Sequence, residues 1–85
     1  MKLLTILATE DVNKECILDL LDANLEGYTI ASTCGIWHGA REHSLLIYIV
    51  DAEPETIEDV TYKIKEMNNQ ESIMVLTIPC GVEFK

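Results

Sequence analysis

Four stretches of the chain have the runs of apolar and β-branched residues that are typical of strands. They cover residues 2–8, 28–34, 44–50 and 72–78. The third stretch, SLLIYIV, is apolar at both odd and even positions, so protein is expected to cover both of its faces. This stretch is therefore predicted to lie inside a sheet rather than at its edge.

Two longer stretches repeat their apolar residues with the period of a helix. The first covers residues 12–25 and is expected to end at Gly27, because a helix end commonly takes a left-handed residue. The second begins at Pro54, whose missing N–H costs nothing in a first helical turn, and ends at Asn68 and Asn69. Both stretches are long enough to cover one face of a small sheet.

The resulting order of elements is βαββαβ, which predicts an α+β, ferredoxin-like fold in a single domain over residues 1–85. Right-handed crossovers would place both helices on one face of a four-stranded antiparallel sheet. Pro79 is expected to end the fourth strand, and residues 82–84 to form a short edge piece. No third helix is available for the other face, so packing between the sheets of several subunits is predicted to cover it.

The charge balance excludes two classes of partner. The chain has 15 acidic and 6 basic residues and a formal net charge of −9. Nucleic acids and anionic membrane surfaces are bound by clusters of Lys and Arg, and here five scattered lysines and one arginine form no such cluster. No nucleic acid partner and no membrane insertion are therefore expected.

Cysteine usage indicates the cellular compartment. The three cysteines, Cys16, Cys34 and Cys80, are odd in number, widely spaced and include no C-x-x-C motif. This pattern fits a reducing, cytoplasmic protein better than a disulfide framework. The first residues show no signal-peptide pattern, and no apolar stretch approaches the ~20 residues of a membrane span.

The residues with distinctive chemistry are concentrated in one connection, residues 35–43, between the second and third strands. It contains the only Trp, the only Arg, both histidines and two of the four glycines. Glycines permit a close backbone approach to a ligand, a Trp covers or stacks on it, and an Arg meets an anionic group. The predicted ligand-binding residues are Gly35, Trp37, His38, Gly39, Arg41 and His43.

Two other interpretations of the same connection stay open. Cys34, His38 and His43 have the ligand types of a site for zinc or another late transition metal, although their spacing matches no closed structural zinc pattern. Alternatively, residues 35–43 dock on a target protein and bind no small ligand. Catalysis is not expected, because no nucleophile elbow, triad signature or phosphate-binding loop is present.

Several short motifs resemble the PII-like superfamily, small trimeric ferredoxin-like proteins that include the nitrogen regulators and the CutA proteins. They are MKLLT at residues 1–5, GYTI at 27–30, WHG at 37–39 and VLTIP at 75–79. The resemblance implies a homotrimer that binds a small effector, a nucleotide or a small anion, in clefts between subunits. A CutA-like protein that binds a divalent transition metal is the alternative that it leaves open.

The chain departs from that pattern where PII proteins bind phosphates. Their connection between the second and third strands is long, whereas residues 35–43 span nine positions. Their Gly- and Lys-rich turn before the fourth strand is replaced here by residues 67–71, MNNQE, which contain neither glycine nor a basic residue. Tight ATP binding of the usual kind is therefore not expected, because nothing would offset the repulsion between an acidic protein and phosphates.

Overall fold

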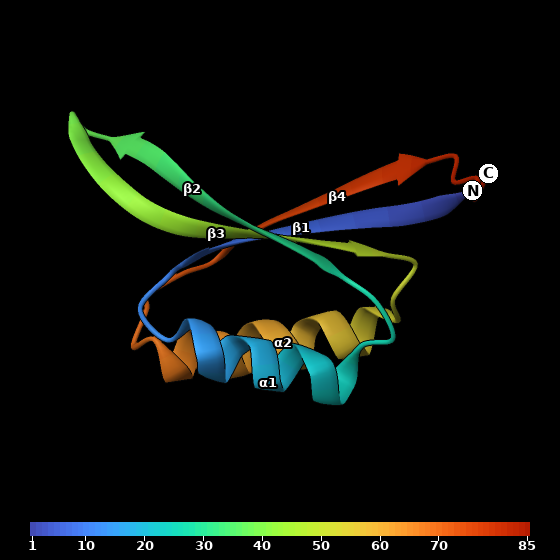
Figure 1. The fold of residues 1–85 in the computed structure, drawn as a ribbon, viewed down its shortest axis with the longest axis horizontal. Coiled ribbons are helices and arrows are strands. Elements are labelled where there is room, and N and C mark those ends of the chain that lie inside the picture. The colour runs from blue at the N-terminus through green and yellow to red at the C-terminus, as the bar shows by residue number, and fades with distance from the viewer.

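The elements occur in the predicted order in a computed structural model that describes residues 1–85 (Figure 1). They are β1 (Lys2–Glu10), α1 (Lys14–Asn24), β2 (Thr29–Trp37), β3 (Ala40–Val50), α2 (Pro54–Met67) and β4 (Met74–Cys80). Neither helix combines the length and the apolar character that a membrane crossing requires. The fold is α+β and ferredoxin-like, as the sequence predicts.

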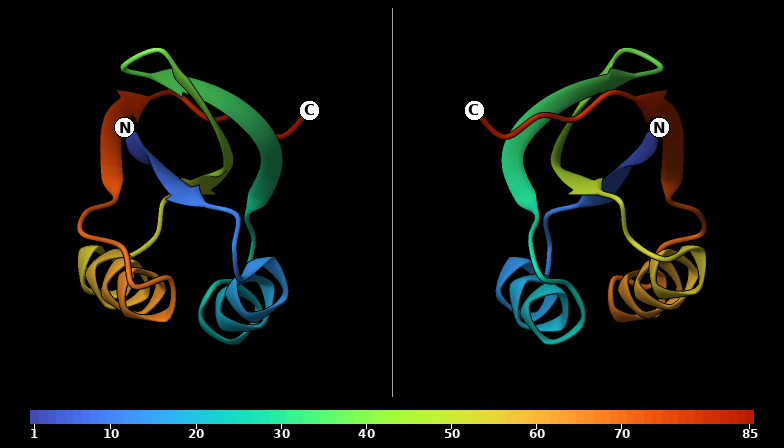
Figure 2. Two further views of the ribbon diagram at one scale, coloured as in Figure 1. Left: turned by 90° about the vertical axis from the view of Figure 1, so that its left-hand side faces the viewer. Right: turned by 90° about the vertical axis from the view of Figure 1, so that its right-hand side faces the viewer.

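The sheet has the strand order β2-β3-β1-β4, and every neighbouring pair is antiparallel. Both helices lie side by side against one face, and the other face carries no element of this chain (Figures 1 and 2). β3 lies between β1 and β2, which confirms that the most apolar stretch is an internal strand.

The core lies between the sheet and the helices. Odd-numbered residues of β1 and β3 point toward the helices, because side chains alternate between the two faces of a strand. They meet the apolar stripes of α1 and α2. The fully buried side chains are Leu7, Ile17, Leu21, Leu45, Ile47, Ile49, Val60 and Ile64. Only 12 of the 85 residues are buried, a small core that reflects the uncovered side of the sheet.

Apolar side chains also occupy the open face. Leu76 pairs with Ile6 and Ile78 with Leu4, on the side of the strands that faces away from the helices. Leu76 and Ile78 are each 41% exposed, and Met74 is 55% exposed. The prediction of an apolar, uncovered sheet face is confirmed, whereas its covering by other subunits stays a prediction.

Residues 35–43 are not a loop, and this prediction was wrong. β2 and β3 continue through them as a hairpin in which Cys34 pairs with His43 and Trp37 with Ala40. Only His38 and Gly39 form the turn, with φ of 49° and 80°. Two consecutive positive φ values are typical of the tight type I′ turn, whose twist matches that of the flanking strands. Glycine at the second position adopts the required positive φ without strain, so the two strands stay paired up to the turn.

The two glycines of the hairpin are expected to respond differently to alanine. Gly39→Ala should lower the free energy of unfolding by about 1 kcal/mol, because an L-residue is strained at positive φ. Gly35→Ala is the matched control: Gly35 is in an extended strand, and a Cβ there would meet no atom within 4 Å. Urea unfolding of both variants at one protein concentration measures the difference. Equal losses would contradict the assigned turn.

Three predicted boundaries also need correction. α1 ends at Asn24, with Leu25 in an extended conformation, so Gly27 does not stop the helix and has no positive φ. β4 continues through Pro79 to Cys80, because an edge strand tolerates a residue without an N–H. Residues 82–84 form no strand.

Candidate functional site

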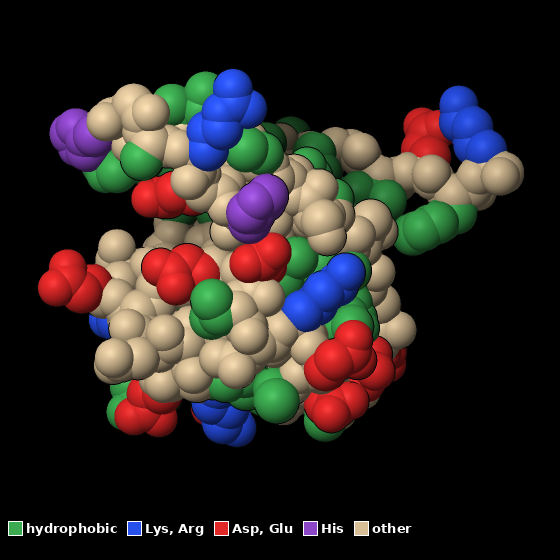
Figure 3. Space-filling model, turned by 60° about the vertical axis from the view of Figure 1, so that its left-hand side comes forward, with side chains coloured by type: hydrophobic (Ala, Val, Ile, Leu, Met, Phe, Trp, Pro, Cys, Tyr) green, Lys and Arg blue, Asp and Glu red, His purple; other side chains and the backbone are tan.

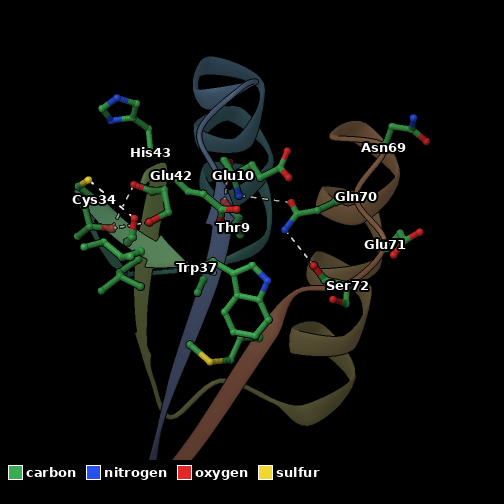
Figure 4. Close-up of a pocket in the computed structure, with 17 residues that line it drawn as sticks. Thr9, Glu10, Cys34, Trp37, Glu42, His43, Asn69, Gln70, Glu71 and Ser72 are labelled. Carbon is green, nitrogen blue, oxygen red and sulfur yellow. Dashed lines mark hydrogen bonds between the residues drawn. The ribbon is translucent and has the colours of Figure 1, made fainter. Parts of the chain in front are cut away.

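A groove of about 840 Å³ lies at one end of the sheet. It is lined by the end of β1, by both strands of the hairpin and by the turn that joins α2 to β4 (Figure 4). These segments meet because β1 and β2 run toward this end, whereas β3 and β4 start from it. The topology thus brings together residues 8–10, 33–37, 42–46 and 69–74, which include segments far apart in sequence.

The structure divides the predicted ligand-binding residues into two groups. Gly35, Trp37 and His43 line the groove, whereas His38, Gly39 and Arg41 do not. The last three lie at or next to the tip of the hairpin, beyond the groove of their own chain. Residues at the tip project from the body of the molecule and are therefore placed to reach a neighbouring molecule.

Because side chains alternate between the two faces of a strand, the predicted residues of the hairpin are also divided between its two faces. Arg41 pairs with Ile36 and lies on one face of the hairpin, whereas Trp37 and Ala40 lie on the other. In Figure 4 the rings of Trp37 and His43 point in opposite directions. The Trp37 ring also contacts His38 edge-to-face, with 4.8 Å between the ring centroids. One chain therefore does not place Trp37 and Arg41 around a common ligand.

Acidic side chains dominate the electrostatics of the groove. Glu10, Glu42 and Glu71 line it, and His43 is its only basic residue. Figure 3 brings this end of the molecule forward and shows acidic side chains around the hollow below the projecting hairpin. Several negative charges in a concave site repel multiply charged anions. A ligand with few negative charges is favoured over a polyphosphate.

A network of side-chain amides holds the turn that forms one wall of the groove. The Nδ2 of buried Asn68 donates to the Glu10 carbonyl oxygen at 3.3 Å and to Gln70 Oε1 at 3.1 Å. Asn13 Nδ2 donates to the Met67 carbonyl oxygen at 3.0 Å. The network therefore joins the end of β1 and the start of α1 to the α2–β4 turn.

The structure contains no group of three or more His, Cys, Asp or Glu side chains that is arranged to hold a metal ion. Cys34 and His43 are opposite each other across the hairpin, whereas His38 is in the turn. A metal site on these three residues would need further ligands from another chain, and it stays a prediction. The Cys34 thiol is 3.9 Å from the Gly35 carbonyl oxygen.

The tyrosines with a raised pKa lie outside this groove. Tyr28 donates a hydrogen bond to Asp22, and Tyr62 donates one to Glu66. Each hydrogen bond, together with the negative charge of its carboxylate, raises the pKa of the tyrosine. Neither tyrosine lines the groove, so both hydroxyl groups with a raised pKa are outside the candidate site.

No family model and no curated protein matches the sequence. Solved structures do match the fold. A DUF3240 family protein from Shewanella baltica OS155 superposes with a TM-score of 0.73 at 14% identity, over 99% of this chain and 94% of that one. CPII, a nitrogen regulatory PII-like protein from Thiomonas intermedia K12, superposes with a TM-score of 0.67 at 24% identity, over 99% and 98% of the two chains.

A third structure, the divalent cation tolerance protein (Cut A1) from Thermus thermophilus, has a TM-score of 0.66 at 11% identity and covers 99% of this chain and 88% of that one. The chain has the fold of the PII-like and CutA proteins. This fold explains why the groove has three walls, since its antiparallel order brings the hairpin, the end of β1 and the α2–β4 turn to the same end of the sheet.

Sequence reasoning missed most of the groove outside the hairpin. Glu10, Asn69, Gln70, Glu71 and Ser72 line it, and none of them was a predicted ligand-binding residue. The signal that could have found them is topological rather than a motif. In a PII-like fold the residues just after β1 and just before β4 lie at the end where the hairpin projects.

Proposed function

We propose that the protein is a PII-like regulatory module that forms a homotrimer and binds a small effector in the clefts between its subunits. The observation that carries this proposal is the groove between the hairpin and the α2–β4 turn. Arg41 lies outside it, on the hairpin that projects from the body of the molecule (Figure 1). A neighbouring subunit would close the groove and supply its own Arg41.

Support for assembly comes from the open face of the sheet. Met74, Leu76 and Ile78 expose about half of their side-chain area on one strand, and Val50 exposes 43% on β3. A contiguous apolar surface of this kind is typical of an interface between subunits. A small domain also gains much of its stability from such an interface. The number of three subunits rests on the PII-like resemblance.

The effector class is inferred from the groove and from its structural relatives. The CPII structure is bound to ADP, AMP and bicarbonate. In this chain, Trp37 offers a flat ring for a heterocycle, and Asn69 offers a side-chain amide on the wall formed by the α2–β4 turn. The carboxylates of the groove disfavour phosphates. The proposed effector is therefore a nucleotide with few phosphates, or a small anion that the neighbour's Arg41 binds.

Titration calorimetry with bicarbonate, AMP, ADP and ATP tests this proposal. Affinity is expected to fall from AMP to ADP to ATP, because each added phosphate increases the repulsion by the groove. Added salt should weaken this order, since it screens the charges. ATP as the tightest ligand would contradict the charge argument. No binding of any of the four compounds would contradict the proposed effector class.

A divalent-metal-binding, CutA-like role is the second candidate. It is favoured by the Cys34–His43 pair, which places a thiol and an imidazole opposite each other on neighbouring strands.

A docking role is favoured by the exposure of Ile36 and Trp37, which are 70% and 67% exposed near the hairpin tip. A thermal shift with Zn²⁺ but not with nucleotides would favour the metal, and no shift with either would favour docking.

A further inference from the structure

Asn13 occupies the N-cap position of α1 but does not cap the helix. No side-chain hydrogen bond from Asn13 reaches the first turn of α1. Its Nδ2 instead donates to the Met67 carbonyl oxygen at 3.0 Å and to Asn68 Oδ1 at 3.1 Å. An N-cap side chain ordinarily stabilises its own helix. Here the same side chain ties the start of α1 to the end of α2.

Asn68 and Gln70 extend this connection to the end of β1. The ladder between β1 and β4 ends at the pair Ala8 and Met74. Beyond it, both main-chain groups of Glu10 are held by side-chain amides: the carbonyl oxygen accepts from Asn68, and the N–H donates to Gln70 Oε1 at 3.4 Å. The amides therefore take the place of the missing strand partner.

The same amides hold the turn itself. Gln70 Nε2 donates to the Ser72 carbonyl oxygen at 2.9 Å. Asn69 has a positive φ of 50°, a conformation that a short polar residue adopts more readily than most others. Asn68 is 8% exposed, and its side-chain amide accepts from Asn13 and donates to Glu10 and Gln70, which restricts the segment that it joins. The turn is thus held by hydrogen bonds within the chain.

We propose that the amide clamp, defined as Asn13, Asn68 and Gln70, positions the wall of the groove that the α2–β4 turn provides. Asn13 and Asn68 are positioning residues, since neither lines the groove, whereas the turn that they hold contributes Asn69, Gln70, Glu71 and Ser72 to it. This inference rests on the proposed function, because it assigns the clamp to the effector site. If the clamp positions this wall, effector affinity depends on the contact between the start of α1 and the end of α2.

The test is substitution of Asn13 by serine and, separately, by aspartate. Both residues are good N-caps, so the start of α1 should be retained, but neither carries the Nδ2 donors of the clamp. AMP affinity is expected to fall about tenfold in both variants, equivalent to the loss of one or two hydrogen bonds. Exchange of the Asn69 and Gln70 backbone N–H groups, which donate to Glu66 and Lys65 carbonyl oxygens, should accelerate in the ligand-free variants.

Asn24→Ser is the matched control, because Asn24 is at the other end of α1 and its side chain donates to the Leu20 carbonyl oxygen. This variant should leave both AMP affinity and exchange in the turn unchanged. Unchanged AMP affinity in both Asn13 variants, with a wild-type protein that binds AMP, would overturn the positioning role alone. A wild-type protein that binds none of bicarbonate, AMP, ADP and ATP would overturn the proposed function and the positioning role with it, even if exchange in the turn accelerates.

Discussion

Substitution of Leu76 by aspartate is expected to dissociate the protein into monomers. Leu76 is on the open face of β4, opposite Ile6 of β1. Burying a leucine in an interface contributes about 1.5–3 kcal/mol, and the proposed trimer would contain three copies of this position. Aspartate loses this contribution and adds the cost of desolvating a carboxylate without a partner.

Val75→Asp is the matched control for this substitution. Val75 is the preceding residue of the same edge strand, is 42% exposed against 41% for Leu76, and points to the other face. Both variants add the same charge to the same strand. Sedimentation equilibrium should find the trimer in the wild type and in Val75→Asp, and the 9.6 kDa monomer in Leu76→Asp. A trimer in all three proteins would show that the open face is not the interface.

Substitution of Arg41 by alanine is expected to weaken effector binding strongly and to leave the trimer intact. A hydrogen-bonded ion pair with an anionic ligand contributes about 1.5–3 kcal/mol, so affinity for AMP should fall roughly 10- to 150-fold. Arg41→Lys keeps the charge but not the planar fork and should lose less affinity. Calorimetry measures the affinity, and sedimentation measures the assembly. Loss of the trimer in Arg41→Ala would instead assign this residue to the interface.

Mixed trimers distinguish an Arg41 that acts on its own subunit from one that acts on a neighbour. Gly35→Trp should block the groove, because Gly35 lines it and has open space at its Cβ position. If Arg41 acts on the neighbouring subunit, trimers that mix Arg41→Ala chains with Gly35→Trp chains regain some binding sites. Each such site combines an intact groove with the Arg41 of the other chain. If mixed trimers bind no more AMP than the unmixed variants, Arg41 does not act across subunits.

The fold could be predicted from the sequence because its core residues follow simple periods. The apolar runs 2–8 and 44–50 lie in β1 and β3, the two adjacent internal strands of the sheet. Pro54 and Asn68 mark the ends of a helix that has the expected bounds. These signals are local, and each agrees with the burial that the structure shows. The end of the first helix was predicted less accurately. Glycine is a common stop signal, but α1 ends at Asn24, before Gly27.

The hairpin could not be predicted because its composition is that of a loop. Gly35, His38 and Gly39 are frequent in turns, and Arg41 and Glu42 interrupt the apolar run of the third strand. The paired strands nevertheless continue to Trp37 and Ala40, because an antiparallel ladder needs backbone groups and not apolar side chains. The signal for this hairpin was a two-residue turn with glycine at its second position. It was missed because all nine residues were assigned to the connection between the strands.

The groove could not be predicted, because its walls are joined by contacts between residues that are distant in sequence. Glu10 and Gln70 are 60 residues apart, yet a hydrogen bond joins them at the edge of the site. No local motif predicts such a pair, since the strand order alone brings the end of β1 next to the α2–β4 turn. The sequence therefore indicated the hairpin wall of the site, whereas its other walls and its negative charge emerged only from the three-dimensional arrangement.

Native mass spectrometry of the untagged protein, with and without added AMP, is the most direct test of an effector site shared between subunits. The expected result is a trimer of 9.6 kDa chains that gains up to three AMP molecules. Arg41→Ala should give the same trimer without AMP. A wild-type monomer, or a monomer that binds AMP as well as the trimer does, would contradict the shared site.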